Sequence, residues 1–216
     1  MRFIKTNRWN MLIGKYNKSV ILTYIGLAVA IVGIYMTYYG DISDISDISY
    51  AFICLVVAGV CDLFDGRVAR MCKRDEDEKE FGVQIDSLVD VVSFLVLPAC
   101  IGIRMYMAHL RVIHIIFVFY ILCGIIRLAW FNMNANTEGP VAYYLGLPVT
   151  YVALILPCIY AISLFVTLHP LIFLMAYILI SFAFILNIKI PKPTGIWYII
   201  FSLMAIAIIA IIALVG

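Results

Sequence analysis

Four aspartates stand at regular spacings in a chain that is otherwise strongly apolar. Asp62 and Asp65 lie in the first of two short segments, and Asp86 and Asp90 lie in the second. Ionisable groups at membrane depth are costly, so they usually face a cavity or a partner and mark a functional site. Carboxylate oxygens are the ligands that hard divalent cations take. The spacing therefore indicates a site for divalent cations together with an anionic ligand.

The first pair of acids shares a helix face with small residues. Each residue of a helix turns by about 100°, so Asp62 and Asp65 fall in one wedge with two small residues and one arginine: Gly66, Ala69 and Arg70. The missing bulk would let an anionic ligand lie close to the helix. Arg70 can clamp a phosphate in bidentate fashion, whereas Arg67 points well away from this wedge.

The second segment repeats the arrangement. Gly82, Asp86 and Asp90 fall within about 80° of one another on a helix, with Ser93 between them. An intramembrane salt-bridge network is the structural alternative, but four acids against Arg70 alone leave that network unbalanced without cations. Two helices, each with a carboxylate pair and a glycine gap, are thus expected to face one another.

The pattern from Asp62 to Asp90 reads D-x2-D-G-x2-A-R-x11-G-x3-D-x3-D. It resembles the signature of the CDP-alcohol phosphotransferases, which are integral membrane enzymes of phospholipid synthesis. The gap between Arg70 and Gly82 is longer than usual, and the extra residues fall within residues 73–80, which we expect to form a soluble connector. Thr23 is present at the entry of the first span, but Val20 stands where family members often carry an asparagine.

This resemblance implies a set of roles. Asp62, Asp65 and Asp86 match the metal-binding acids of the family, and Asp90 is implied both to contact metal and to act as general base on the acceptor hydroxyl. Two Mg²⁺ or Mn²⁺ ions would bridge phosphate oxygens and stabilise the leaving group. The residues implied to hold the nucleotide and its phosphates are Asp62, Gly66, Ala69, Arg70 and Gly82. Family members are commonly homodimers, so a homodimer is expected.

Three further stretches resemble the phosphatidylserine synthase branch of the family. Residues 86–98 contain D-S-L-x-D-x-V-S-F, residues 127–132 read R-L-A-W-F-N, and residues 146–148 read G-L-P. The resemblance implies transfer of a phosphatidyl group from CDP-diacylglycerol to L-serine, with release of CMP. The chain departs from the branch at four positions, which carry Val89, Leu95, Leu97 and Trp130.

Two residues outside the signature could contact the acceptor. A guanidinium suits a planar carboxylate, and Arg127 is the best-placed partner for that of serine. It could instead bind a lipid phosphate, or extend to the headgroup layer. Ser93 could hydrogen-bond the acceptor or a metal-bound water, or it could bond back to its own helix.

Composition indicates the fold class. The chain has 216 residues, is 65% hydrophobic and 13% charged, and has a mean hydropathy of +1.08. A soluble domain is about half apolar, and here the apolar residues form runs of about 20, the length that crosses a bilayer. We expect an all-α, polytopic transmembrane bundle of about seven spans, with six to eight possible. The expected spans are residues 19–39, 50–71, 81–105, 111–131, 145–166, 170–187 and 195–215.

The chain is expected to form one domain over residues 1–216. Residues 1–18, which are basic, should form a short interfacial lead-in, and no cleavable signal peptide stands out in them. A threefold Asp-Ile-Ser repeat at residues 41–49 should be a solvated connector.

Basic residues predict the orientation. With the N-terminus in the cytosol, all of the 15 lysines and arginines except Arg104 and Arg111 fall on the inner side. The acids would then open to the cytosol from the cell (inner) membrane. The expected partners are CDP-diacylglycerol, L-serine and membrane lipid, without nucleic acid.

Two alternatives stay open. The same mechanism could use glycerol phosphate or an inositol phosphate, in which case the cavity should carry several extra basic residues. A metal-ion or small-solute transporter would also use intramembrane acids, but it should show acids reachable from both faces or inverted repeats.

Overall fold

The computed structural model describes residues 17–39, 45–106, 113–134, 143–193 and 195–216. Almost all of the basic lead-in predicted for residues 1–18 therefore lies outside the described residues, as do Asp41 and Asp44 of the Asp-Ile-Ser repeat. The helices are η1 (Lys18–Val20), α1 (Ile21–Tyr39), α2 (Ile45–Met71), α3 (Glu76–Asp90), η2 (Val91–Val96), α4 (Leu97–Met105), α5 (Ile113–Asn134), η3 (Val149–Tyr151), α6 (Val152–Ser163), α7 (Leu171–Ile185) and α8 (Ile196–Val215).

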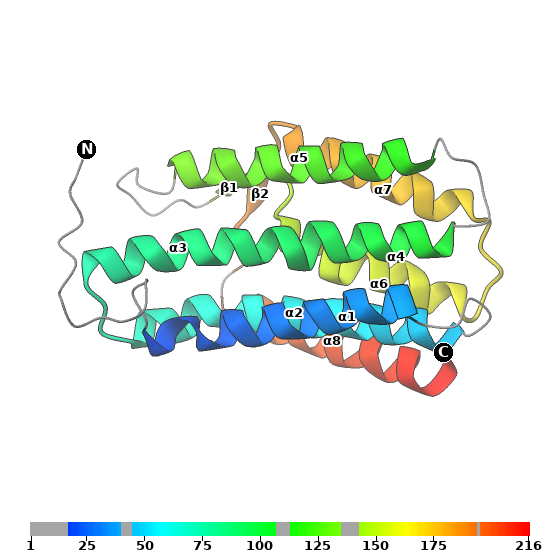
Figure 1. Ribbon diagram of the computed structural model, residues 1–216, viewed down its shortest axis with the longest axis horizontal. Helices are drawn as coiled ribbons and strands as arrows, with labels where there is room; N and C mark the ends of the chain where they lie inside the picture. The colour runs from blue at the N-terminus through cyan, green and yellow to red at the C-terminus, as the bar shows by residue number, and fades with distance from the viewer. Residues whose placement is uncertain (1–16, 40–44, 107–112, 135–142, 194) are drawn as a thin grey trace.

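These helices run side by side along the long axis of the molecule (Figure 1). Five continuous helical segments are long and apolar enough to cross a membrane, and two more, Val149–Ser163 and Leu171–Ile185, are apolar but shorter. Together they correspond to the seven predicted spans. The prediction of an all-α polytopic membrane bundle is confirmed.

Two helices begin earlier than hydropathy predicted. Helix α2 starts at Ile45, so residues 45–49 are helical and the predicted connector is wrong there. Helix α3 starts at Glu76 because Asp75 caps it: the Asp75 carboxylate accepts from the Glu78 N–H, and the Glu78 carboxylate accepts from the Asp75 N–H. This capping box satisfies two backbone donors, so residues 76–80 form helix rather than connector.

A small β-ribbon accounts for the shortness of the fifth and sixth spans. Strand β1 (Tyr143–Leu145) pairs antiparallel with β2 (Lys189–Pro191), with Tyr144 opposite Ile190. Gly146 follows β1 with φ +74°, and a Cβ there would lie 2.4 Å from the Phe184 carbonyl oxygen. Helices α6, α7 and α8 stop near the ribbon, whereas α2, α3 and α5 continue past it (Figure 1).

The helix that carries Asp86 and Asp90 widens immediately after Asp90. Residues 91–96 form a π-helical turn, and the Leu97 N–H bonds to the Val92 carbonyl, five residues back. Pro98 lacks the N–H that would normally bond the Phe94 carbonyl. The Tyr120 hydroxyl on α5 donates to that carbonyl instead, at 2.6 Å. Single π-helical turns of this kind often occur at functional sites.

Small residues bring α1 and α2 close together. A Cβ on Gly33 would lie 2.9 Å from the Cβ of Cys54, and one on Gly26 would lie 3.2 Å from the Cβ of Cys61. Membrane helices use such small residues to pack closely. The contact holds Thr23 of α1 against the acid-bearing turn of α2.

Candidate active site

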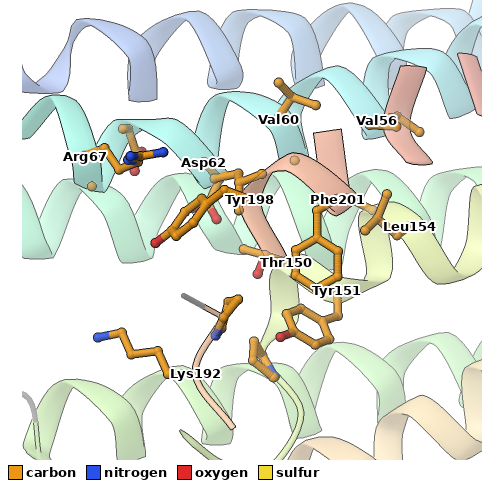
Figure 2. Close-up of a pocket in the computed structure, with 18 of the residues that line it drawn as sticks. Val56, Val60, Asp62, Arg67, Thr150, Tyr151, Leu154, Lys192, Tyr198 and Phe201 are labelled. Atoms are coloured by element: carbon orange, nitrogen blue, oxygen red, sulfur yellow. The ribbon is translucent and has the colours of Figure 1, made fainter. Parts of the chain in front are cut away.

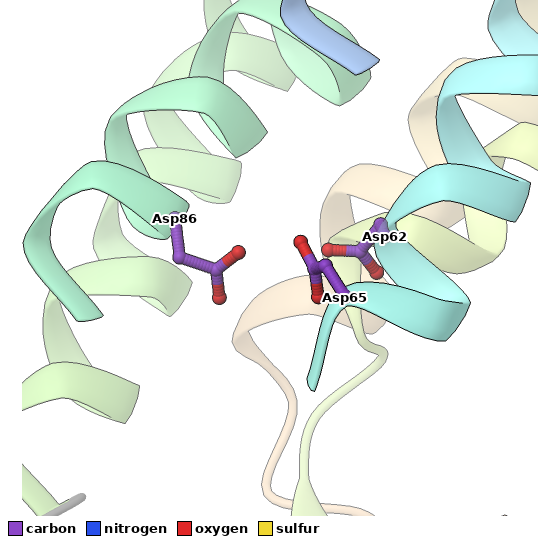
Figure 3. Close-up of side chains that lie close together, drawn as sticks. All are labelled: Asp62, Asp65 and Asp86. Carbon is purple, nitrogen blue, oxygen red and sulfur yellow. The ribbon is translucent and has the colours of Figure 1, made fainter. Parts of the chain in front are cut away.

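Three of the predicted carboxylates meet between two helices. Asp62 and Asp65 project from α2 toward Asp86 of α3 (Figure 3). One oxygen of each lies within 4.8 Å of the others. Asp65 is only 8% exposed, and its Oδ2 accepts a hydrogen bond of 3.0 Å from the Thr23 hydroxyl. The convergence that the helical spacing predicted is present.

The fourth carboxylate adjoins this group. Asp90 lies within hydrogen-bonding range of Asp62. It lines a small cavity together with the three other acids and Ser93. The Ser93 hydroxyl is buried and has no hydrogen-bond partner among the described residues, so it does not bond back to its own helix. It is therefore available to an acceptor or a metal-bound water.

The donor set fits a divalent metal. All four groups offer carboxylate oxygens, which Mg²⁺ and Mn²⁺ take. In the described part of the chain, none of these carboxylates forms an ion pair with a lysine or arginine. Buried acids without such partners are costly. Bound cations would supply the missing positive charge.

A cavity of about 230 Å³ opens beside the acids. Five residues of the signature line it: Asp62, Asp65, Gly66, Arg70 and Asp86. Ala69 and Gly82 are not among its lining residues. A Cβ on Gly82 would lie 3.6 Å from Nη1 of Arg74. Of the residues predicted to hold the nucleotide, Asp62, Gly66 and Arg70 thus line this cavity.

The other wall of the cavity was not predicted (Figure 2). It comes from the ribbon, the start of α6 and the start of α8, and its polar and aromatic members are Tyr144, Thr150, Tyr151, Lys192, Tyr198 and Phe201. Arg67 also lines the cavity, with its guanidinium 4.8 Å from the centre of the Tyr198 ring. The Lys192 ammonium lies 5.6 Å from the centre of the Tyr144 ring. Arg67 therefore lines the same cavity as Asp62, Asp65 and Asp86.

Arg127 is buried rather than extended to the headgroup layer. It is 7% exposed, and its Nε has no hydrogen-bond partner. Its guanidinium lies 5.2 Å from the Phe131 ring centre and 5.9 Å from that of Tyr144, and Asp90 is close enough to attract it. Arg127 also lines a second, mostly apolar cavity of about 290 Å³ between α5 and the end of α7. Arg127 is therefore a buried cation in the neighbourhood of Asp90.

A family model described as CDP-alcohol phosphatidyltransferase matches residues 16–215. The chain belongs to this family. The match covers all four aspartates and the whole wall of the cavity. Because the family consists of transferases, the alternative of a transporter is not retained.

Named relatives agree with this family assignment. A CDP-diacylglycerol–serine O-phosphatidyltransferase of Saccharomyces cerevisiae is 37% identical over 50% of this chain and 40% of its own length. A protein of the same name from Methanocaldococcus jannaschii is 32% identical over 74% of each chain. An archaetidylserine synthase of Methanothermobacter thermautotrophicus is 34% identical over 67% of this chain and 59% of its own length. The chain thus spans less than half of the yeast relative that it matches.

Proposed function

We propose that this membrane protein transfers a phosphatidyl group from CDP-diacylglycerol to L-serine, giving phosphatidylserine and CMP. The observation that carries the proposal is the convergence of Asp62, Asp65 and Asp86 beside Asp90, at the edge of a cavity lined by Arg70. The names of the relatives support serine, since serine is common to them while the lipid group differs between phosphatidyl and archaetidyl.

The acids are proposed to hold two divalent cations, Mg²⁺ or Mn²⁺. Asp62, Asp65 and Asp86 are the principal ligands, and Asp90 completes the set. When bound, such ions neutralise the pyrophosphate of the donor and stabilise the departing phosphate. Arg70 clamps a phosphate of the nucleotide, and the open space at Gly66 lets the nucleotide lie against α2.

Asp90 is the proposed general base. It accepts the proton of the serine hydroxyl as the serine oxygen forms a bond to the phosphorus on the lipid side of the pyrophosphate. The bond from that phosphorus to the bridging oxygen breaks, and CMP leaves. Asp90 is half-buried and lines the small cavity that Asp62 also lines, and this is the position from which it would reach the hydroxyl.

Arg127 is proposed to hold the carboxylate of serine. It is a buried cation in the neighbourhood of Asp90, and its Nε has no hydrogen-bond partner among the described residues. A guanidinium presents two parallel donors to a carboxylate. Ser93, whose hydroxyl is also unpartnered, is placed to contact the acceptor or a metal-bound water.

An acceptor with a second phosphate is the remaining alternative. Arg67 and Lys192 line the main cavity in addition to Arg70, and these extra cations would suit glycerol phosphate or an inositol phosphate. Serine is preferred because the relatives named above are serine enzymes by their names. The single domain over residues 1–216, the cytosolic opening at the cell (inner) membrane and the homodimer stay predictions from the sequence.

A panel of acceptors tests the proposal. Purified protein receives CDP-diacylglycerol, Mg²⁺ or Mn²⁺, and one of three alcohols: L-serine, glycerol 3-phosphate or an inositol phosphate. The lipid product is then identified by mass. Phosphatidylserine formed with serine supports the proposal, whereas a product from a phosphorylated acceptor alone would replace it with the alternative.

A further inference from the structure

A hydrogen bond between two side chains joins α3 to α5, in addition to the bond from Tyr120 to the Phe94 carbonyl. The Ser87 hydroxyl on α3 donates to Oδ1 of Asn132 on α5, at 3.0 Å, and both residues are half-buried. Ser87 directly follows Asp86 and precedes Asp90 by three residues. Asn132 lies five residues after Arg127 on the same helix.

The two helices belong to different packing pairs. Helix α3 packs on α1, and α5 packs on α7, whereas the described parts of α3 and α5 make little direct backbone contact with each other. Figure 1 shows α5 running in a separate layer above α3. The π-helical turn η2 and helix α4, which continue α3 beyond Asp90, do pack on α5. On the α3 side of Asp90, the Ser87–Asn132 hydrogen bond adds a second link between the two helices.

We propose that the Ser87–Asn132 hydrogen bond is a positioning device that fixes the distance between Asp90 and Arg127, and so aligns the acceptor. The inference rests on the proposed function, in which Asp90 takes the hydroxyl proton and Arg127 holds the acceptor's anionic group. Neither Ser87 nor Asn132 needs to contact the reacting atoms. Both helices are rigid over one to two turns, so a shift at the hydrogen bond moves the two functional side chains relative to each other.

A misaligned acceptor has a chemical consequence. When the acceptor hydroxyl is not held beside Asp90, water can take its place, lose a proton to Asp90 and attack the same phosphorus. The products are then phosphatidate and CMP, instead of phosphatidylserine and CMP. Each turnover still releases one CMP, so the ratio of transferred lipid to CMP reports the alignment.

The test compares five variants of the full chain. Ser87→Ala is expected to raise the KM for the acceptor roughly three- to tenfold, the range for loss of one neutral hydrogen bond. The KM for CDP-diacylglycerol should stay near that of the unmodified protein, and the ratio of transferred lipid to CMP should fall. Ser87→Thr keeps the hydroxyl and should restore both quantities. Ser163→Ala is the matched control, because that hydroxyl bonds only to the Tyr160 carbonyl of its own helix.

Asn132→Ala completes a double-mutant cycle. It should raise the acceptor KM similarly, and Ser87→Ala combined with it should add little. The same cycle on thermal unfolding measures the hydrogen bond without any substrate. Equal loss of activity toward both substrates with an unchanged lipid-to-CMP ratio, or fully additive effects, would overturn the inference.

The acceptor in these assays is the one that the unmodified protein uses best in the panel. Failure of serine in the panel therefore refutes the proposed function but leaves the positioning role testable with the other alcohol. Wild-type values for Ser87→Ala refute the positioning role alone.

Discussion

The Thr23 hydroxyl on α1 donates a 3.0 Å hydrogen bond to Oδ2 of Asp65 on α2, deep in the bundle. This bond orients one carboxylate of the proposed metal site from a helix that carries none of the four acids. Groups that orient metal ligands commonly affect metal affinity by 10- to 100-fold. Thr23 is thus a supporting residue for the metal site.

Replacing Thr23 by valine removes this bond with little change in volume. Thr23→Val should raise the concentration of Mg²⁺ or Mn²⁺ needed for half-maximal activity on the order of tenfold, and Thr23→Ser should not. Direct Mn²⁺ binding, measured by electron paramagnetic resonance, should shift in parallel. An unchanged Mn²⁺ affinity in Thr23→Val would show that Asp65 does not depend on this bond.

Variants of the proposed metal ligands show the effect of losing metal binding directly, for comparison with Thr23→Val. Asp62→Asn, Asp65→Asn and Asp86→Asn should each weaken Mn²⁺ binding and nucleotide binding together, because the ions link the two. Asp77→Asn, an exposed acid in the first turn of α3, is the matched control and should change neither.

The Asp90→Asn variant distinguishes the role of general base from that of metal ligand. Loss of a general base acts on the chemical step and typically costs 10²- to 10⁴-fold. Transfer should fall in that range while binding of CDP-diacylglycerol stays largely intact, as measured by isothermal titration in detergent. Near-normal turnover of Asp90→Asn would remove Asp90 from the role of base.

The site was predictable where it depends on local spacing, and less so elsewhere. Asp62, Asp65 and Asp86 converge because a helix turns by a fixed angle per residue, and that angle can be applied to a sequence. The ribbon of β1 and β2, which carries Tyr144 and is followed by Lys192, could not be found in this way, because it joins two three-residue strands that are more than 40 residues apart. Such pairing depends on tertiary structure rather than on any local pattern.

The ends of the helices were likewise predictable from the sequence only in part. Hydropathy ends a span at its first charged residues, so it missed the start of α3, where Asp75 and Glu78 cap the helix. A capping box can be recognised in a sequence, but the run of charged residues around it is equally typical of a soluble connector. The burial of Arg127 could not be predicted, since a cation near a span end usually reaches the headgroups.

Arg127 should govern the affinity for the acceptor. Lysine keeps the charge but cannot present the planar fork of a guanidinium. Arg127→Lys is expected to raise the KM for serine roughly tenfold or more and the KM for CDP-diacylglycerol much less, in steady-state assays with each substrate varied. Arg104→Lys, in the last turn of α4, is the control. A parallel rise of both constants would place Arg127 at the lipid phosphate instead.

Sidedness can be tested with single cysteines in a chain whose own six cysteines are replaced. A cysteine in place of Lys73, between α2 and α3, should react with an impermeant maleimide only from the cytosolic face. A cysteine in place of Asp47, at the other end of α2, should react only from outside. The reverse labelling pattern would contradict the orientation and the access of a cytosolic nucleotide substrate.

The identity of the lipid product tests the central claim most directly. Purified protein is incubated with CDP-diacylglycerol, a divalent cation and L-serine, and the lipids are analysed by mass spectrometry alongside parallel reactions with glycerol 3-phosphate and an inositol phosphate. The account predicts phosphatidylserine and one equivalent of CMP with serine, and loss of both when the cation is chelated. No lipid product from serine, with product from a phosphorylated acceptor, would contradict it.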